Sequence, residues 1–284
     1  MAPPLVSFVT WNRLGLNVRN LSALLETPCD FELHIIDSNS NDGTWEFIQH
    51  LTDSRIASKT LLDANRGPVY ASKGHYFIKV DNDVHILTPA WAEEFLKAFE
   101  AFPDVGLLGA VTKEYYDRYR QPLIQHEKGG VAYLQLHKGF VEGCCQCLRP
   151  ELLEMLGYWS EENCMGDAEI CQRIQNYTPY NAGFLPAVSI DQAQYIPCAE
   201  CKGKKWCKLA ECGKTCFDHR QEKYRNPQFR TKYGWKWLKN MEEMNKGNRA
   251  AYCGSVHDEA SIVRCSYNRL MASENFRYYE DNAN

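Results

Sequence analysis

The sequence of 284 residues has no apolar run that approaches the roughly 18 consecutive residues needed for a membrane-spanning helix. Its first residues, MAPPLVSFVTWNR, lack the basic and long apolar segments of a secretory signal peptide. We therefore expect no membrane span and a cytoplasmic location. The sequence also lacks internal repeats and long disordered tracts. With 44% hydrophobic residues, it can bury a substantial core in one large domain or two small ones.

Cysteine is abundant, with 13 residues. A reducing cytosol favours thiols or metal ligands over disulfides. The spacing Cys198-x2-Cys201 is typical of a zinc knuckle, and these two are the firmest candidate ligands. The segment holds more candidates than the four that one tetrahedral zinc takes, and reduced thiols or a disulfide are the alternatives. The candidate zinc ligands are Cys198, Cys201, Cys207, Cys212, Cys216 and His219.

A second cysteine group adjoins an apolar run, so we interpret it as packing residues: Cys144, Cys145 and Cys147.

Charge is unevenly distributed although the net charge is only -4. Residues 198–250 contain 14 Lys and Arg against 6 Asp and Glu, so the rest of the chain is acidic. Within this region, HRQEKYRNPQFRTKYGWKWLKNM interleaves basic and aromatic side chains, which can pair with phosphates and stack on bases. A nucleic-acid partner, such as DNA with a hydroxylated base, is one hypothesis. A carbohydrate platform, packing on the core and a simple solvated face are the others.

Strand and helix patterns alternate along the first two thirds of the chain. Alternation of this kind favours an α/β fold, with a mostly parallel sheet covered by helices on both faces. After Pro197 the composition changes to Cys, Lys and aromatics, so we predict one domain at 1–195 and a Cys-rich appendage with a helical region at 196–284. The predicted strands are 5–11, 31–37, 55–63, 75–81, 105–111 and 182–192, and the predicted helices are 15–26, 42–51, 89–102, 149–159 and 166–175.

Polar residues follow four of the predicted strands where each strand ends. In an open α/β sheet, ligands bind beyond the carboxyl ends of the strands, so these residues indicate a crevice for a polar ligand. They are Thr10, Asn12 and Arg13, then Asp37, Asn65 and Arg66, and finally Asp81 and Asp83.

Four short motifs in this order resemble those of the family 2 glycosyltransferases, which have the GT-A (Rossmann-like) fold and use nucleotide-diphospho-sugars. SFVTWNR is similar to the first-strand motif of the family, and IIDSNSNDGTWE to its Val-Asp-Asp-Gly-Ser-Thr-Asp-Gly-Thr. DANRG resembles Glu-Asn-Arg-Gly, and VDND resembles Asp-X-Asp. The resemblance covers about residues 5–195.

The resemblance implies roles for the crevice residues around a nucleotide-sugar donor, for which we expect a UDP-sugar. Asp37 would accept from the base, and Asp81 would lie near the ribose and sugar. Asp83 would bind a divalent cation that bridges the diphosphate. The other implied donor-binding residues are Thr10, Asn12, Arg13, Asn65 and Arg66.

Downstream, GDAEICQR resembles the segment in which the family has a Glu-Asp pair at a helix start, with Asp as general base. Asp167 would take that role, although Gly166 replaces the Glu. Asp191 stands where the family often has a metal-binding His. An all-oxygen set suits Mn2+ or Mg2+. The expected reaction is a single displacement that inverts the anomeric carbon.

Two other functional classes are compatible with parts of this pattern. One is a non-catalytic nucleic-acid-binding module on a GT-A scaffold, which the intact carboxylates disfavour. The other is a nucleotidyltransferase, which would be expected to have a Gly-rich, basic triphosphate loop near the N-terminus, and TWNRLGLN lacks one. The acceptor stays open among saccharide, peptide and modified DNA.

Overall fold

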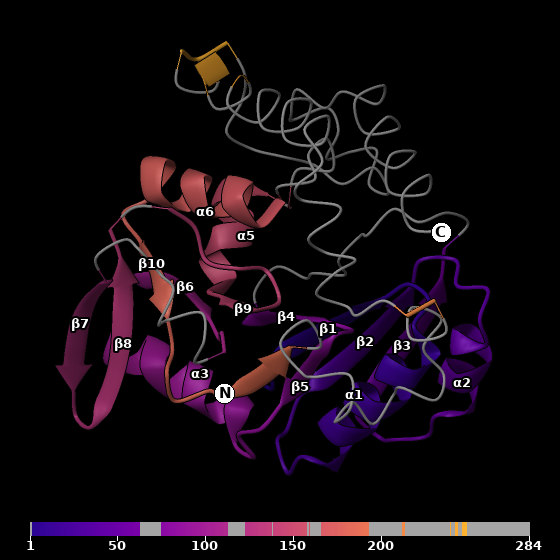
Figure 1. Cartoon of the computed structure of the whole chain (residues 1–284). Helices are drawn as coiled ribbons and strands as arrows, with labels where there is room; N and C mark the ends of the chain where they lie inside the picture. Colours follow the sequence, from indigo (N-terminus) through magenta and orange to yellow (C-terminus); the bar gives the residue numbers. More distant parts are fainter. Residues whose placement is uncertain are drawn as a thin grey trace.

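The computed structural model describes residues 2–62, 75–112, 123–137, 139–157, 159 and 166–192, with 212–213, 239, 242–243 and 246–248 further on (Figure 1). Among these residues, no helix has the length and apolarity to cross a membrane. The strands are β1 Leu5–Thr10, β2 Glu32–Asp37, β3 Ile56–Leu61, β4 Phe77–Asp81, β5 Val84–Ile86, β6 Val105–Gly109, β7 Leu123–Lys128, β8 Val131–Leu136, β9 Cys145–Leu148, β10 Asn181–Phe184 and β11 Ile190–Gln192. The helices are α1 Leu14–Glu26, α2 Thr44–His50, α3 Trp91–Ala101, α5 Pro150–Leu156 and α6 Gly166–Tyr177.

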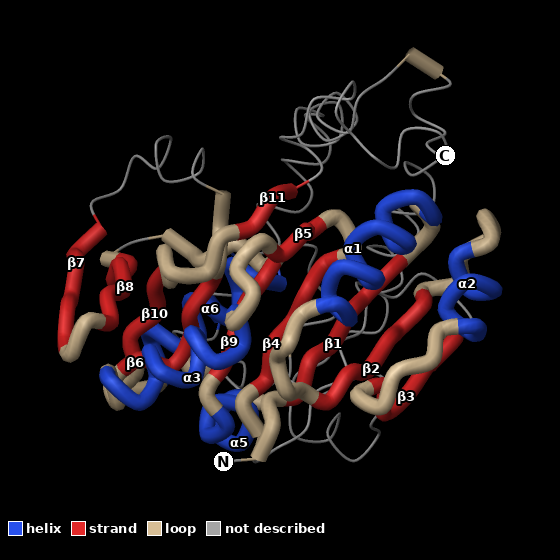
Figure 2. The backbone as a smooth tube through the Cα atoms, turned by 90° about the horizontal axis from the view of Figure 1, so that it is seen from below, coloured by secondary structure: helices blue, strands red, loops and turns tan. Residues whose placement is uncertain are grey.

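Nine strands form one sheet in the order β3-β2-β1-β4-β9-β6-β10-β8-β7 (Figure 2). Strands β3, β2, β1 and β4 pair in parallel, and β10 is parallel to β6. Strand β9 lies antiparallel between β4 and β6, and the β7–β8 hairpin adds an antiparallel edge. A separate ladder pairs β5 with β11. The mixed α/β sheet agrees with the predicted fold class.

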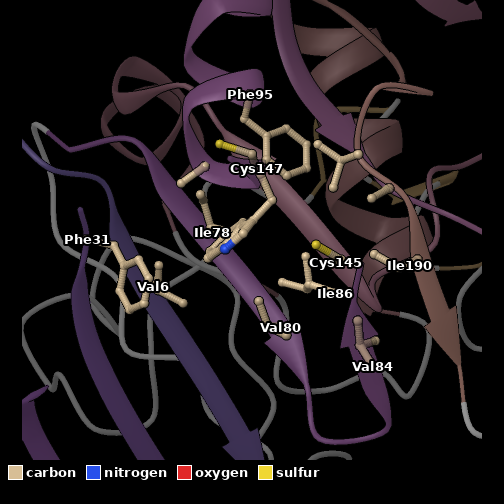
Figure 3. Packing of buried hydrophobic residues seen from close by; sticks show 14 of the residues in the cluster. Val6, Phe31, Ile78, Val80, Val84, Ile86, Phe95, Cys145, Cys147 and Ile190 are labelled. Carbon is tan, nitrogen blue, oxygen red and sulfur yellow. The ribbon is translucent and has the colours of Figure 1, made fainter. Parts of the chain in front are cut away.

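Helices cover both faces of the sheet. Because neighbouring residues of a strand point to opposite sides, one strand contributes to both cores. Along β4, Ile78 and Val80 pack with α1, α2 and α3 residues, whereas Phe77 packs with α5 and α6 residues. Figure 3 shows part of the first core, where Ile78 and Val80 lie near Phe95 of α3 and the buried Cys145 and Cys147. The predicted packing role of the 144–147 cysteines is therefore confirmed.

Two predicted local features were wrong. The sequence Thr88-Pro89 predicts a helix that starts at Pro89 with Thr88 as its N-cap, but α3 begins at Trp91 after Ala90. The Thr88 hydroxyl instead donates to the Ala187 carbonyl (3.1 Å) and accepts from the Ser189 amide (2.8 Å). The single strand predicted at 182–192 is two strands in two different sheets, β10 and β11.

The stretch GGVAYLQLH (129–137) is typical of an edge strand, and β8 confirms a strand there, but the antiparallel pairing of this region was not predicted. Residues 123–136 form the β7–β8 hairpin, whose turn residues Gly129 and Gly130 have φ values of 59° and 79°. Glycine adopts this left-handed conformation without a steric penalty, which suits a tight hairpin turn. Strand β9 is fully buried and has no polar alternation, so its short sequence CQCL carries little strand signal.

A buried ion pair within α6 is also hydrogen-bonded to the end of α5. Arg173 is fully buried and bonds both carboxylate oxygens of Glu169, with Nε–Oε1 at 2.6 Å and Nη2–Oε2 at 2.9 Å. Its Nη1 also donates to the Leu156 carbonyl at the end of α5 (2.6 Å). The guanidinium therefore ties the C-terminus of one helix to the helix that carries Asp167.

We predict that Arg173→Met lowers the free energy of unfolding by about 3 kcal/mol, because it leaves the Glu169 charge buried without its partner. The measurement is urea unfolding followed by circular dichroism. Lys97→Met is the matched control, since Lys97 also pairs with a helical Glu but is exposed. Its unfolding midpoint should stay at the wild-type value, and equal effects of the two substitutions would contradict the prediction.

Candidate functional site

The strand order places the site at the switch point of the sheet. β1 lies between β2 and β4, and these three parallel strands end at Thr10, Asp37 and Asp81. The register pairs Thr10 with Asp37 and Val9 with Asp81. The polar residues predicted after these strands are therefore brought together at one sheet edge, as expected for a ligand crevice in an open α/β sheet.

The loops after β1 and β2 adopt unusual backbone conformations. In the described part of the chain, only Asn12, Arg13 and Asn39 are non-glycine residues with positive φ, at 52°, 67° and 66°. Such residues cluster at functional sites, where the surrounding structure holds them in place. Asn39 stands where the resembling motif has Gly, and Asn is the side chain that best tolerates this conformation.

Ser40 holds the Asp37 carboxylate in a fixed orientation. The Ser40 amide donates to Asp37 Oδ1 (2.7 Å), and its hydroxyl donates to Oδ2 (2.6 Å). The same hydroxyl accepts from the Asn12 amide (2.6 Å). Asp37 is fully buried, and burial raises its pKa although the Ser40 bonds oppose the rise. Its predicted contact with a base stays a prediction.

Asn17 on α1 connects the end of β1 and the loop after it with the start of α2. Its Oδ1 accepts from the Thr10 hydroxyl (2.7 Å), and its Nδ2 donates to the Asn12 carbonyl (2.7 Å) and to Thr44 Oγ1 (3.0 Å). Asn17 is fully buried. Thr10 therefore supports the loop through a buried hydrogen bond, in addition to the donor contact predicted for it.

Asn82, between the two aspartates, fixes the turn after β4. Its carbonyl accepts from Asn20 Nδ2 on α1 (2.8 Å), and its own Nδ2 lies 3.3 Å from Thr10 Oγ1 and 3.4 Å from the Asn12 carbonyl. The turn that carries the carboxylates is thus anchored to α1 and to the loop after β1.

Lys79 is the cation beside Asp81. Its Nζ lies 2.6 Å from Asp81 Oδ1 and donates to the Gly143 carbonyl (2.7 Å). Burial alone would lower the pKa of Lys79, but the Asp81 carboxylate outweighs it and raises the pKa, so Lys79 stays charged. Burial raises the pKa of Asp81, Lys79 opposes this rise and Asp83 adds to it.

Asp83 has a looser cation partner than Asp81. Arg13 Nη1 lies 3.4 Å from Asp83 Oδ2, and 37% of the Arg13 side chain is exposed. Lys79 is held more closely, since only 18% of its side chain is exposed and it has a second anchor at Gly143. The two carboxylates are thus held differently: Asp83, with 17% of its side chain exposed, has the longer contact, and Asp81, with 38% exposed, has the closer ion pair.

Asp167 lies in the first turn of α6 and is joined to this cluster through Gly143. Its Oδ2 accepts from the Gly143 amide (3.0 Å), and the Gly143 carbonyl in turn accepts from Lys79. A Cβ at position 143 would lie 2.9 Å from the Asp167 Cβ, so only glycine allows this approach. Asp81 and Asp167 both act electrostatically on Lys79.

The β5–β11 ladder brings Asp191 towards the turn after β4. Asp191 pairs with His85, two residues beyond Asp83, and Gln192 pairs with Val84. Within the described ranges, no group of three or more His, Cys, Asp and Glu side chains is arranged to hold a metal ion.

Several predicted site residues lie outside the described residues, and their roles remain predictions. Asn65 and Arg66 are among them, as is the predicted boundary at 196. Of the candidate zinc ligands, Cys212 alone is described, and it is exposed. Those outside are Cys198, Cys201, Cys207, Cys216 and His219.

Sequence reasoning missed Lys79, Ser40 and Gly143. Lys79 had a detectable signal, because residues i and i+2 of a strand share a face and a charged residue two positions before Asp81 is unusual in a buried strand. Gly143 had none, because its partners are 24 and 64 residues away.

The fold and site define a class: a GT-A-type α/β protein with a carboxylate cluster at the switch point of its sheet. The model of the family "Glycosyl transferase family 2" matches residues 7–157, so the chain belongs to that family. This confirms the resemblance of the sequence motifs.

The chain is similar to several known proteins. The mannosyltransferase PcManGT of Pyrobaculum calidifontis, solved with GDP-Man and Mn2+, has a TM-score of 0.50 and 21% identity over 68% of this chain and 58% of its own. S. aureus TarS with UDP has a TM-score of 0.47 and 14% identity over 66% and 59%. An uncharacterized Sinorhizobium fredii protein, y4gI, is 28% identical over 61% of this chain. The chain spans only 23% of that relative's length.

We predict that the stability difference between wild type and Asp37→Asn changes with pH. Burial raises the pKa of folded Asp37 above its ordinary 3.8, so the folded wild type holds this proton more tightly than the unfolded chain. Its contribution is full below the unfolded pKa and is lost as pH rises through the folded pKa. Urea unfolding at about pH 3.5 and about pH 7 should show wild type losing stability relative to the variant. A constant difference, or one of the opposite sign, would contradict this.

Proposed function

We propose that this chain is a metal-dependent, inverting glycosyltransferase that moves a sugar from a nucleotide-diphospho-sugar, expected to be a UDP-sugar, to an acceptor hydroxyl. The observation that supports it most is the grouping of two carboxylates after β4 with a third, Asp167, through Lys79 and Gly143. Membership of the family 2 glycosyltransferases gives the same reaction class. The relative solved with GDP-Man and Mn2+ supports a nucleotide-diphospho-sugar donor and a divalent metal, but not the choice of UDP.

The donor side of the proposed site lies over the ends of β1, β2 and β4. Thr10, Asn12 and Arg13 would line the nucleoside pocket with Asp37, and Asn65 and Arg66 would complete it near the base or diphosphate. The rigid hydrogen-bond network through Ser40 and Asn17 supports this assignment, because preorganised polar groups bind a ligand without paying to become ordered. Asp81, held by Lys79, would face the ribose and sugar.

The proposed metal ligands are of a kind that suits a hard divalent cation. Asp83 and Asp191 supply carboxylate oxygens, and Mg2+ typically binds through one or two carboxylates plus the phosphates of a substrate. The loose Arg13 contact leaves Asp83 able to exchange its partner for a cation. When bound, Mn2+ or Mg2+ would supply Lewis-acid stabilisation of the charge on the leaving diphosphate. Arg13 would then be able to pair with the same phosphates.

Asp167 is the proposed general base. A hydroxyl becomes a competent nucleophile when a positioned base takes its proton as the new bond forms. The Gly143 amide bonds Asp167 Oδ2, so Oδ1 is the oxygen left to receive the acceptor proton. Attack from the Asp167 side, opposite the departing diphosphate, is a single displacement, and the anomeric configuration would invert.

Replacement of Asp167 by Asn should lower kcat by about 10²- to 10⁴-fold, the usual contribution of a general base. Donor binding should persist, because Asp167 does not contact the donor in this proposal. Turnover is measured as nucleoside diphosphate release with the best acceptor from a panel of saccharides, peptides and modified DNA, and donor binding as thermal stabilisation. Near-normal turnover would contradict the proposed base.

Asp83→Asn should instead change how donor binding depends on metal. The amide is neutral and a poorer ligand for a hard cation, so thermal stabilisation by UDP-sugars and GDP-sugars should no longer depend on added Mn2+. Asp167→Asn is the control, because it is expected to retain the Mn2+-dependent shift. If Asp83→Asn keeps the wild-type Mn2+ dependence, Asp83 is not the metal ligand.

A further inference from the structure

Lys79 is a charged residue in an otherwise buried strand. The other β4 residues before Asp81 are buried, and Lys79 shares with Phe77 the face of the sheet that α5 and α6 cover. A lysine in such surroundings generally needs a partner for its charge. The four sequence motifs that resemble the family do not include this position, so the resemblance assigns Lys79 no role.

The polar side chains level with Lys79 on the flanking strands are not the partners of its ammonium. β4 lies between β1 and β9 (Figure 2), and the strand register places Ser7 and Gln146 opposite Lys79. Residues opposite one another in neighbouring strands share a face. Yet Ser7 Oγ and Gln146 Oε1, both buried, have no hydrogen-bond partner among the residues that the structure describes. Lys79 is thus not used to satisfy these oxygens, and its side chain extends towards the carboxyl end of β4.

The Lys79 ammonium joins two groups from different parts of the fold. Its Nζ lies 2.6 Å from Asp81 Oδ1, at the end of its own strand, and 2.7 Å from the Gly143 carbonyl, in the loop before β9. An ammonium has three donors and no acceptor, so one lysine side chain can hold both oxygens at once. Hydrogen bonds from a charged donor are also stronger than those between neutral groups. The position of Gly143 therefore depends on Lys79.

Gly143 is held through both of its backbone groups. Its carbonyl accepts from Lys79, and its amide donates to Asp167 Oδ2 at 3.0 Å. The Asp167 side chain also packs directly on Gly143, because a Cβ at position 143 would lie 2.9 Å from the Asp167 Cβ. A displacement of Gly143 would therefore also displace the Asp167 carboxylate.

We propose that Lys79 is a positioning residue for transfer: through Gly143 it holds the Asp167 carboxylate at a fixed place relative to the carboxylates after β4. The inference rests on the proposed function, in which Asp167 is the general base. It adds a residue that acts through other groups rather than on a substrate. Because the same ammonium holds Asp81, one cation sets the distance between the donor and acceptor sides of the site.

A double-mutant cycle in the full chain tests this role. All variants carry Asp81→Asn, so that Lys79→Met does not leave a carboxylate without its ion-pair partner. With Asp167 present, Lys79→Met should lower kcat at saturating donor by about 10- to 100-fold, because a misplacement of about 1 Å can cost about 10²-fold. With Asp167→Asn, Lys79→Met should change kcat by less than about twofold, because residues that act as a unit are not additive. A general structural loss would appear in both backgrounds.

Lys59→Met is the matched control for this cycle. Lys59 is also a strand lysine whose ammonium donates to two backbone carbonyls, but those carbonyls lie at the end of α2. The control should leave kcat unaltered whether or not Asp167 is present. Thermal melting confirms that each variant is folded at the assay temperature.

Hydrogen exchange followed by mass spectrometry measures the same effect without requiring turnover. If Lys79 holds Gly143, Lys79→Met should make the Gly143 amide exchange about tenfold faster, because its bond to Asp167 opens more often. Peptides from the β7–β8 hairpin should exchange at an unchanged rate, which separates the local effect from general unfolding.

Three results would overturn the proposal: an unchanged kcat for Lys79→Met with Asp167 present, an equal loss with and without Asp167, or unchanged exchange of the Gly143 amide. The proposed function fails by separate readouts, which are the absence of turnover and of the Mn2+-dependent thermal shift in wild type. In that case the exchange rate still decides whether Lys79 positions Gly143 and Asp167.

Discussion

The site depends on the compensation of like charges at the end of β4. Two aspartates separated by one residue repel each other, and a third carboxylate lies close enough to act electrostatically on Lys79 and Asp81. Lys79 and Arg13 provide the balancing cations. The two pairs differ in strength, with 2.6 Å and a second anchor for Lys79 against 3.4 Å for Arg13. The two aspartates are thereby held by different cations from different strands and loops.

The rest of the fold supports this arrangement from both faces of the sheet. α1 supplies Asn17 and Asn20, which anchor the loop after β1 and the turn after β4. On the other face, the buried Glu169–Arg173 pair fastens α6 to the end of α5, and α6 carries Asp167. The antiparallel strand β9 begins two residues after Gly143, so the central sheet also positions the residue that joins Lys79 to Asp167.

Much of the fold follows from local patterns in the sequence. The predicted strand at 5–11 and the helix at 15–26 closely match β1 and α1, because hydrophobic periodicity is a property of neighbouring residues. Prediction failed where residues far apart in the sequence determine the bounds of an element. The 182–192 segment divides between two sheets because Ile190 pairs with Ile86, and Thr88 bonds the 187–189 turn in place of capping α3. No pattern among neighbouring residues indicates partners that lie about 100 residues away.

The sequence by itself determined the family, the order of the strand ends and the carboxylates Asp37, Asp81, Asp83 and Asp167, since each lies in a short motif of fixed spacing. Only the tertiary structure decided which cation accompanies each of the two aspartates after β4 and how Asp167 joins them. The physical reason is that these features depend on residues brought together from distant segments, such as 79 with 143 and 143 with 167.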